Sequence, residues 1–231
     1  MVAVLAGAAV IVTLTAAAPQ SGTRTRPMQN PDGTRPGLAP TVDHEDRSAA
    51  FGLIWNVRLG ERATKEGYLR GRYGPEWSDH APGVPLSGNG CNTRDDVLAR
   101  DGESVEYEDE SRCAVASMRL VDAYTGELID WSRQHDVLQV DHVFPLSLAW
   151  RMGASRWPDE ERLRFANDPL NLLPVRGEVN EAKGGSGPGG WLPPWQRVRC
   201  SYSVRFAQVA LKYDLPVTRT AKIAMLRQCW G

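Results

Sequence analysis

Histidine is the side chain best suited to proton transfer near pH 7, so its positions come first in a search for chemistry. Four histidines occur in the 231-residue chain, and three of them directly follow an aspartate. The Asp-His pairs at 43–44 and 79–80 lie in segments rich in proline and glycine. The pair Asp141-His142 instead ends a mainly apolar run at 137–140 and precedes further apolar residues. A buried strand ending at this pair would hold both side chains rigidly, so Asp141 and His142 are the candidates.

Three polar residues that could complete a site follow this pair: Asn171, then Asn180 and Lys183 in the sequence Asn-Glu-Ala-Lys-Gly. A neutral imidazole can deprotonate water, which makes His142 a candidate general base for hydrolysis. A hard divalent cation on oxygen ligands could hold the charge of a phosphate, and Asp141 and Asn180 are its candidate ligands. Two protein ligands leave room for water and phosphate, which favours Mg²⁺, Mn²⁺ or another divalent cation over a closed zinc site.

Each of these residues also has an ordinary structural interpretation. A buried histidine bonded to the backbone, asparagines in turns and a solvated lysine are all common in proteins without a catalytic site. The prediction therefore rests on the order of the whole set rather than on any single member.

That order, Asp-His, then Asn, then Asn-x-x-Lys-Gly, resembles the HNH endonucleases, whose ββα-metal motif surrounds one divalent cation with a hairpin and a helix. The segments DHVFPLSLAWRMGASRW, FANDPLNLLPV and WLPP more closely resemble the secreted HNH domains of the DUF1524 family, as do GNGCNTRDDVLARD and the hairpin around AYTGELI. The resemblance spans about residues 68–231. It implies that Asn171 braces a loop and orients His142, and that Lys183 contacts phosphate or developing charge.

The chain also departs from the pattern of that family. Asn180 stands where many such motifs have a histidine, which implies weaker metal binding. Residues 185–190 read GSGPGG where acidic residues often follow, so this stretch either alters substrate fit or is a simple linker. Arg94 is a weaker candidate for a phosphate clamp because a guanidinium donates bidentately. Its alternative is a surface ion pair with Asp95 or Asp96.

The charges are balanced overall but uneven along the chain. The 27 Lys and Arg against 28 Asp and Glu exclude a histone-like polybasic binder, although a local basic face remains possible. From Trp191 to Gly231, seven Lys or Arg residues stand against Asp214 alone. This excess predicts either a solvated helical face or a surface for an anionic polymer.

The composition divides the chain into three parts. Residues 1–18 are small or apolar, carry no charge and end in three alanines, which predicts a cleaved signal peptide. Because no basic residue precedes them, an uncleaved membrane anchor facing outward is the alternative. Residues 19–45 lack hydrophobic periodicity and predict a flexible linker. Residues 46–231 predict one nuclease domain, secreted and without stable membrane association after cleavage.

Four cysteines, an even number in an exported chain, favour disulfide bonds. Three pairings are possible, and we favour the two local ones, Cys91–Cys113 and Cys200–Cys229. A structural zinc site is the alternative, but no Cys-x-x-Cys spacing is present.

The predicted elements are few strands among several helices, which indicates an α+β fold. We expect helix-like spacing at 46–75, a short helix at 93–100, helices at 146–157 and 158–167, and helices at 200–213 and 218–230 with Thr218 as N-cap. We expect strands at 114–121, 127–131 and 137–143, with a hairpin loop at 122–126. A solvated acidic loop is expected at 101–110, and 172–175 is a short apolar run.

These features predict a secreted, metal-dependent HNH endonuclease that contacts the phosphates of DNA, with RNA as a second candidate substrate. Low sequence specificity is expected because no recognition helix or zinc finger is visible. The alternative is a non-catalytic secreted module that binds an anionic polymer through the same scaffold. Neither His-Glu-x-x-His nor a nucleophile elbow occurs, which argues against a metalloprotease or a serine hydrolase.

Overall fold

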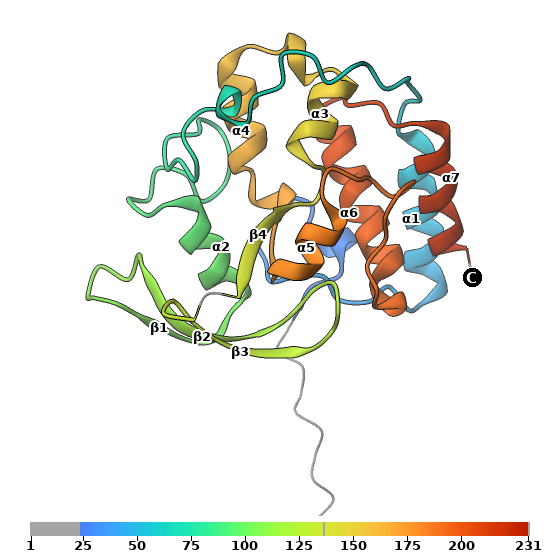
Figure 1. The fold of residues 1–231 in the computed structure, drawn as a ribbon. Coiled ribbons are helices and arrows are strands. Elements are labelled where there is room, and N and C mark those ends of the chain that lie inside the picture. The colour runs from blue at the N-terminus through green and yellow to red at the C-terminus, as the bar shows by residue number, and fades with distance from the viewer. Residues whose placement is uncertain (1–23, 136, 231) are drawn as a thin grey trace, which may run out of the picture.

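The strand segments predicted around residues 114–143 form two antiparallel sheets in the structure, a computed structural model that describes residues 24–135 and 137–230. The first sheet has the order β1 (Glu103–Tyr107), β2 (Val115–Val121) and β3 (Leu128–Ser132), and it lies at the lower edge of Figure 1. The predicted hairpin loop joins β2 to β3. Its Asp122 carboxylate accepts hydrogen bonds from the backbone N–H groups of Tyr124 and Thr125, at 2.6 and 3.0 Å.

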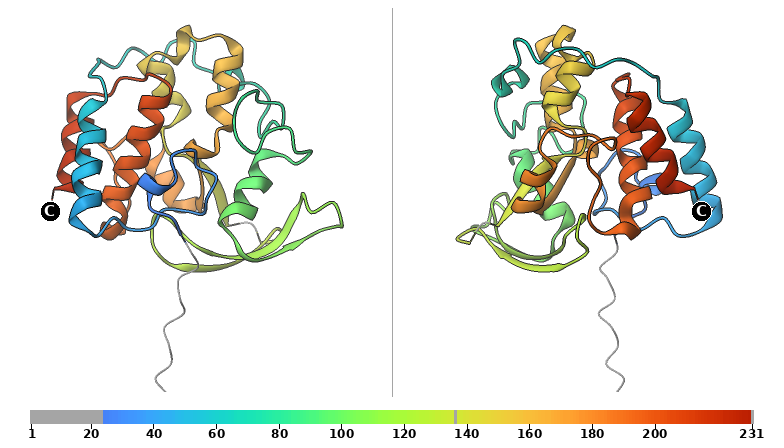
Figure 2. Two further views of the ribbon diagram at one scale, coloured as in Figure 1. Left: turned by 180° about the vertical axis from the view of Figure 1, so that it is seen from behind. Right: turned by 45° about the vertical axis from the view of Figure 1, so that its right-hand side comes forward.

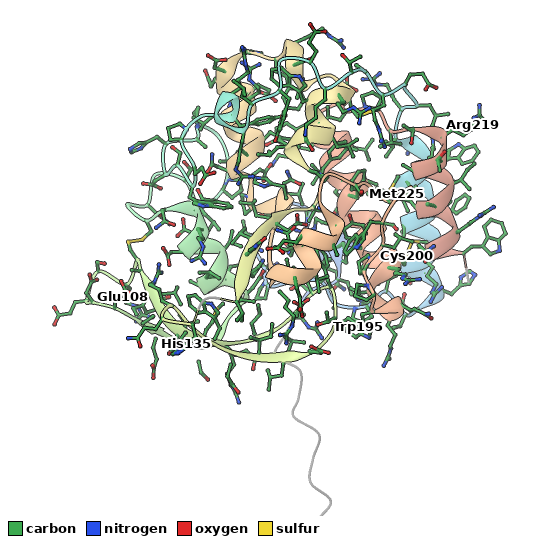
Figure 3. All side chains as sticks on the ribbon, viewed as in Figure 1. Glu108, His135, Trp195, Cys200, Arg219 and Met225 are labelled. Atoms are coloured by element: carbon green, nitrogen blue, oxygen red, sulfur yellow. A yellow bond between two sulfur atoms is a disulfide. The ribbon has the colours of Figure 1, made fainter. Side chains whose placement is uncertain are left out.

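Strand β1 replaces part of the acidic loop predicted at 101–110, so that prediction was wrong for residues 103–107. β1 is an edge strand, where side chains alternate between half-buried and exposed. Glu106 can therefore face water while the backbone of β1 pairs with β2 and Val105 packs against the core, and the half-buried Glu103 pairs with Arg119 of β2. The acidic residues beyond it are exposed, and Figure 3 shows Glu108 at the outer end of the hairpin.

The second sheet carries the candidate site. Strand β4 (Leu138–His142) pairs with β5 (Leu172–Arg176), with Asp141 opposite Leu173 and His142 opposite Leu172. Helix α5 (Gly177–Lys183) follows β5 directly, so two antiparallel strands and a helix form one unit (Figure 1). The predicted third strand is therefore confirmed, and the apolar run at 172–175 is its partner.

Helices α3 (Leu146–Met152) and α4 (Asp159–Asn167) lie between the two strands in the chain. α3 is shorter than predicted because Gly153, with φ 138°, ends it and a 3-10 turn follows. α4 begins after Pro158 with three acidic residues in its first turn, as the sequence indicated. α2 (Thr93–Asp101) begins after Asn92, whose side chain accepts a hydrogen bond from Asp95 N.

Three helices, α1 (His44–Asn56), α6 (Arg199–Lys212) and α7 (Arg219–Cys229), form a layer on the side of the domain away from the first sheet (Figure 1). α6 and α7 confirm the predicted C-terminal helices, and the Thr218 hydroxyl caps α7 by accepting from Ala221 N. Both favoured disulfides are present. Cys200–Cys229 joins the start of α6 to the end of α7, and Cys91–Cys113 joins the residues before α2 and β2.

Residues 24–42, which we call the N-terminal strap, belong to the predicted flexible linker but lie packed against the domain (Figure 2). Leu38 is fully buried, and Gly37 N donates a hydrogen bond to the Asp101 carboxylate at 2.7 Å. At Gly33, with φ 75°, an added Cβ would lie 2.3 Å from Leu170 Cα. Backbone hydrogen bonds and a close glycine contact hold the strap, and neither produces hydrophobic periodicity in the sequence.

The predicted leader at 1–18 and residues 19–23 of the predicted linker lie outside the described residues. Within 24–135 and 137–230, every helix is too short or too polar to cross a membrane.

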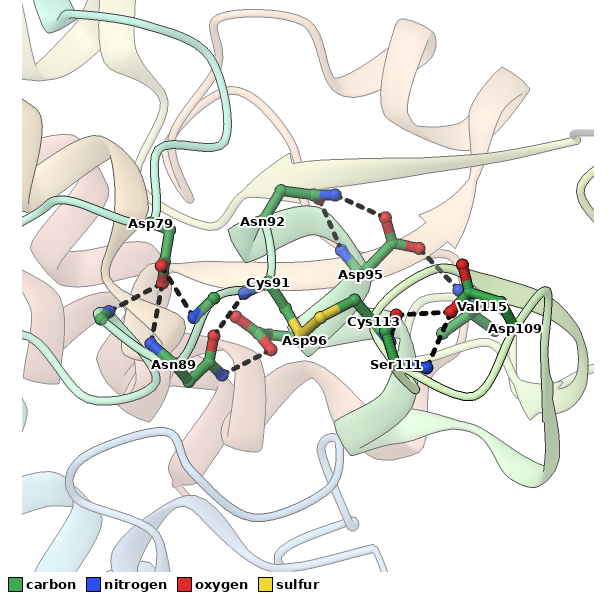
Figure 4. The surroundings of a disulfide bond; sticks show 12 residues. Asp79, Asn89, Cys91, Asn92, Asp95, Asp96, Asp109, Ser111, Cys113 and Val115 are labelled. Atoms are coloured by element: carbon green, nitrogen blue, oxygen red, sulfur yellow. Dashed lines mark hydrogen bonds between the residues drawn. A yellow bond between two sulfur atoms is a disulfide. The ribbon is translucent and has the colours of Figure 1, made fainter.

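The helix-like spacing at 46–75 produces only α1, which ends at Asn56, and a long connection with one 3-10 helix (Arg70–Tyr73) follows up to α2. Figure 4 shows how its end is anchored beside the Cys91–Cys113 disulfide. The Asp79 carboxylate accepts hydrogen bonds from the N–H groups of residues 88, 89 and 90, at 2.7, 3.1 and 2.9 Å. These bonds close a loop within the connection itself.

Candidate active site

An open cleft of about 560 Å³ lies beside the end of β4. It is lined from β4 and α5, from α2 and the start of α3, and from the 57–92 connection. Its polar and aromatic lining residues are Tyr68, Arg70, Trp77, Arg94, Gln139, Asp141, His142, Ser147 and Asn180. Of the six site residues predicted from the sequence, four therefore line one cleft, whereas Asn171 and Lys183 are buried beneath it.

His142 is the last residue of β4, and its imidazole is held from two directions. Its Nε2 lies 2.9 Å from the carbonyl oxygen of Ala166. A carbonyl only accepts, so Nε2 carries the hydrogen and Nδ1 retains its lone pair. The Trp77 indole stacks on the ring, with centroids 5.9 Å apart and an interplanar angle of 12°.

The His142 ring is neutral at pH 7. The pKa of His142 is lowered to about 3. Burial is the main cause, the hydrogen bond to Ala166 opposes the lowering, and the positive charges of Arg70 and Lys183 add to it. A neutral ring with one donating and one unprotonated nitrogen can accept a proton from a water in the cleft.

Asp141 lies at the floor of the cleft and is 5% exposed. Its carboxylate accepts from Lys183 Nζ at 2.9 Å on Oδ1 and 2.8 Å on Oδ2, and from the Tyr124 hydroxyl at 2.5 Å on Oδ2. Burial raises the pKa of Asp141, and the Lys183 ammonium opposes that rise. Oδ1 bears a single hydrogen bond, so it keeps capacity for a further ligand on the cleft side.

Lys183, the last residue of α5, is 1% exposed. Besides the Asp141 carboxylate, its Nζ donates to the His142 carbonyl oxygen at 2.8 Å. All of its hydrogen bonds therefore tie α5 to the end of β4, whereas the resemblance implied a contact with phosphate. The ammonium fixes both Asp141 and the backbone of His142.

Asn171 holds the turn that follows His142. Its side-chain oxygen accepts from Phe144 N at 2.8 Å, and its backbone oxygen accepts from Val143 N at 2.8 Å. Its amide nitrogen donates to the carbonyl oxygens of Phe144 and Phe165, at 3.3 and 3.5 Å. Asn171 thus fixes the chain direction immediately after the histidine and does not reach the cleft.

Asn180 reaches the cleft from the middle of α5. Its Nδ2 donates to Gln139 Oε1 at 2.8 Å, which orients the amide. Its oxygen accepts no hydrogen bond from any other described residue. Within the described ranges no group of three or more His, Cys, Asp or Glu side chains could hold a metal. The donors present, one carboxylate oxygen and one amide oxygen, suit a hard cation that keeps most of its water ligands.

Arg94, which lies on α2, also lines the cleft. Its guanidinium lies over the Trp131 ring of β3, 5.9 Å from the ring centroid. The neighbouring Asp95 is buried and binds Arg133 and the backbone N–H of Val115.

Sequence reasoning missed three residues that shape the site: Tyr124, Arg70 and Trp77. Tyr124 lies in the recognised hairpin, but nothing local indicates that its hydroxyl reaches Asp141, 17 residues away. Arg70 lies near the end of the segment with helix-like spacing and Trp77 lies just beyond it, and both meet His142 only through the tertiary fold.

Three of the seven basic residues in the C-terminal stretch serve the fold. Arg205 is 1% exposed in the core, and Lys212 pairs with the buried Asp168. Lys222 donates to the carbonyl oxygens of Trp55 and Val57 at the end of α1, at 2.6 and 2.8 Å. These three cations are used in packing and capping, which removes much of the excess that could have formed a surface for a polymer.

Comparison with known proteins places this domain in a nuclease-related class. Residues 92–228, more than half of the chain, match the C-terminal domain of GmrSD restriction endonucleases. The chain belongs to this family. A protein of Arthroderma benhamiae described as an uncharacterized secreted protein is 38% identical over 200 residues, which cover 84% of this chain and 92% of the relative. No solved structure matches the chain.

Proposed function

We propose that the protein is a metal-dependent endonuclease of the HNH type that hydrolyses phosphodiester bonds of DNA, with RNA as a second substrate class. The observation that carries the proposal is the state of His142: a neutral ring at the cleft with Nε2 bound to Ala166 and Nδ1 unprotonated. The family match supports the nuclease class. Low sequence specificity is part of the proposal because the cleft is open and polar.

In the proposed mechanism, each of the site residues has one role. Nδ1 of His142 accepts a proton from the attacking water. Asp141 Oδ1 and the Asn180 amide oxygen would hold a divalent cation, Mg²⁺ or Mn²⁺, which when bound stabilises the charge on the phosphate and the leaving oxygen. Lys183 and Tyr124 fix the Asp141 carboxylate, and Asn171 fixes the turn after His142.

The decisive experiment is plasmid cleavage by purified protein with Mg²⁺ and with excess EDTA. His142→Ala is expected to reduce cleavage by about 10²–10⁴-fold, the usual contribution of a general base. His80→Ala, at an exposed histidine in the 57–92 connection, is the matched control and should cleave like the wild type. Circular dichroism establishes that both variants fold. Unchanged cleavage by folded His142→Ala would remove the proposed base.

A non-catalytic module that binds an anionic polymer is the second candidate. The observation that favours it is that Lys183 and Tyr124 both donate to the Asp141 carboxylate, which leaves little capacity on its oxygens for a cation. This candidate predicts that the wild type binds DNA in both Mg²⁺ and EDTA but cleaves neither DNA nor RNA over a panel of divalent metals.

We further propose that the protein acts outside the cell. Its two disulfides are typical of an oxidising compartment, and the relative from Arthroderma benhamiae is described as secreted. Expression in the native host, followed by N-terminal sequencing of protein from the medium, tests export and cleavage after residue 18. Recovery only from the cell membrane fraction would favour an uncleaved anchor.

A further inference from the structure

Residues 68–77, which lie outside the segment matched to the family, contribute to the lining of the cleft. Tyr68, Arg70 and Trp77 line the main cleft together with His142. Arg70, Trp77 and His142 also line a smaller hollow that adjoins it. An arginine and a tryptophan from one loop therefore line the same two hollows as the proposed base.

Arg70 presents its guanidinium in a defined orientation. Its side chain is 51% exposed, and its Nε donates to Glu76 Oε1 at 2.7 Å. Across the described residues, its two Nη groups have no hydrogen-bond partner. A guanidinium held through Nε offers its two Nη groups as a planar fork, the geometry that matches two oxygens of a phosphate.

Trp77 is held in a conformation that its residue type disfavours. Its φ is 54°, in the left-handed region that residues other than glycine disfavour. Its backbone oxygen accepts from Thr93 N at 3.2 Å, and Thr93 Oγ1 donates to the Ser78 carbonyl at 3.0 Å. Together with the Asp79 bonds, these contacts fix the strained turn and lay the indole parallel to His142. Such strain is concentrated at functional sites.

We propose that Arg70 binds a phosphate of a nucleic acid strand in this cleft, next to His142, and that Trp77 positions the His142 ring against that phosphate. The other cations near the site are less suited to this task. Lys183 is buried and saturated by Asp141 and His142. The Arg94 guanidinium lies over Trp131. The phosphate-binding part of the proposal concerns binding alone, and only the role of Trp77 rests on the proposed endonuclease activity.

The binding test uses a fluorescein-labelled 20-base-pair DNA duplex in EDTA, followed by anisotropy over a range of salt concentrations. Arg70→Gln is expected to weaken binding about tenfold and to reduce the salt slope by about 1, because one phosphate contact is lost. Arg70→Lys should recover part of the affinity. Arg72→Gln is the matched control, since Arg72 is exposed on the same 3-10 helix but lies over the Trp150 ring, and it should bind like the wild type. Equal affinity and salt slope for Arg70→Gln and wild type would overturn the assignment of Arg70.

The cleavage test separates positioning from binding. Trp77→Gly removes the ring while allowing the positive φ, so the backbone turn is retained. It is expected to lower kcat for oligonucleotide cleavage about tenfold with KM unchanged, and Trp77→Phe should recover most of the rate. Arg70→Gln should instead raise KM. Equal kcat for folded Trp77→Gly and wild type would overturn the role of Trp77.

The two tests also distinguish this inference from the proposed function. If the wild type cleaves nothing while Arg70→Gln loses affinity, the result supports the phosphate site. It overturns the proposed endonuclease activity and, with it, the role of Trp77. If the wild type cleaves and Arg70→Gln binds and cleaves normally, the endonuclease stands and the phosphate site at Arg70 is overturned.

Discussion

Replacing Lys183 by methionine tests whether the ammonium under the cleft holds the end of β4. The substitution keeps an apolar stem of similar length but removes three short contacts, two to the Asp141 carboxylate and one to the His142 carbonyl. Removing one partner of a buried ion pair typically costs about 3–5 kcal/mol. Because the Tyr124 hydroxyl continues to donate to Asp141, we expect the lower end, about 3 kcal/mol.

The loss should depend on pH in a defined direction. Burial raises the pKa of Asp141, and in Lys183→Met nothing of equal strength opposes that rise. The folded-state pKa then lies above the unfolded value of about 3.9, so between these two pKa values the folded variant binds a proton that the unfolded chain has released. The deficit is therefore largest near pH 7 and shrinks as the pH falls towards 4.

Urea unfolding at pH 7 and pH 5 measures both effects. Lys65→Met, at an exposed lysine, is the control and should change the free energy of unfolding by no more than about 0.5 kcal/mol. The double variant Lys183→Met/Asp141→Asn removes the unpaired charge and should recover at least half of the loss. A loss below about 1 kcal/mol, or a deficit that grows as the pH falls, would refute the reasoning.

Three further predictions concern the strap, the helical layer and the metal. Gly33→Ala should destabilise the protein by more than about 2 kcal/mol in urea unfolding, because its Cβ would meet the backbone of Leu170. Gly83→Ala, at nearly the same φ but in open space, should cost only about 1 kcal/mol, and similar losses for the two would argue against the close contact. Replacing Cys200 and Cys229 by serine should lower the free energy of unfolding by about 3–4 kcal/mol. An unaltered melting temperature would contradict this prediction. Excess EDTA should abolish plasmid cleavage and added Mg²⁺ restore it; cleavage that persists in EDTA would rule out the proposed cation.

Elements with a local cause were predictable. The Thr218 cap acts over three residues, and the Asp122 turn over two or three, so the sequence around each contains the whole interaction. The two disulfides join cysteines 22 and 29 residues apart, and the local pairing was the favoured one of three.

Elements held by distant partners were not predictable. β1 is a strand because β2 offers it a backbone partner, although two of its five residues are glutamates and acidic residues follow it. The N-terminal strap is ordered by contacts with α2, α6 and the residues before β5, more than 60 positions away. Composition describes what a segment can bury by itself, and in both cases the stabilising group belongs to another segment.

By itself, the sequence determined which side chains with catalytic potential are present and their order, and it placed Asp141 and His142 at the end of a strand. The tertiary structure decided what each charged group faces. It buried Lys183 against Asp141 and brought Arg70 and Trp77, from the connection between α1 and α2, to the lining of the cleft. The physical reason is that the role of a charge depends on its burial and on its nearest partners. Here most of those partners lie 17 to about 70 residues away along the chain.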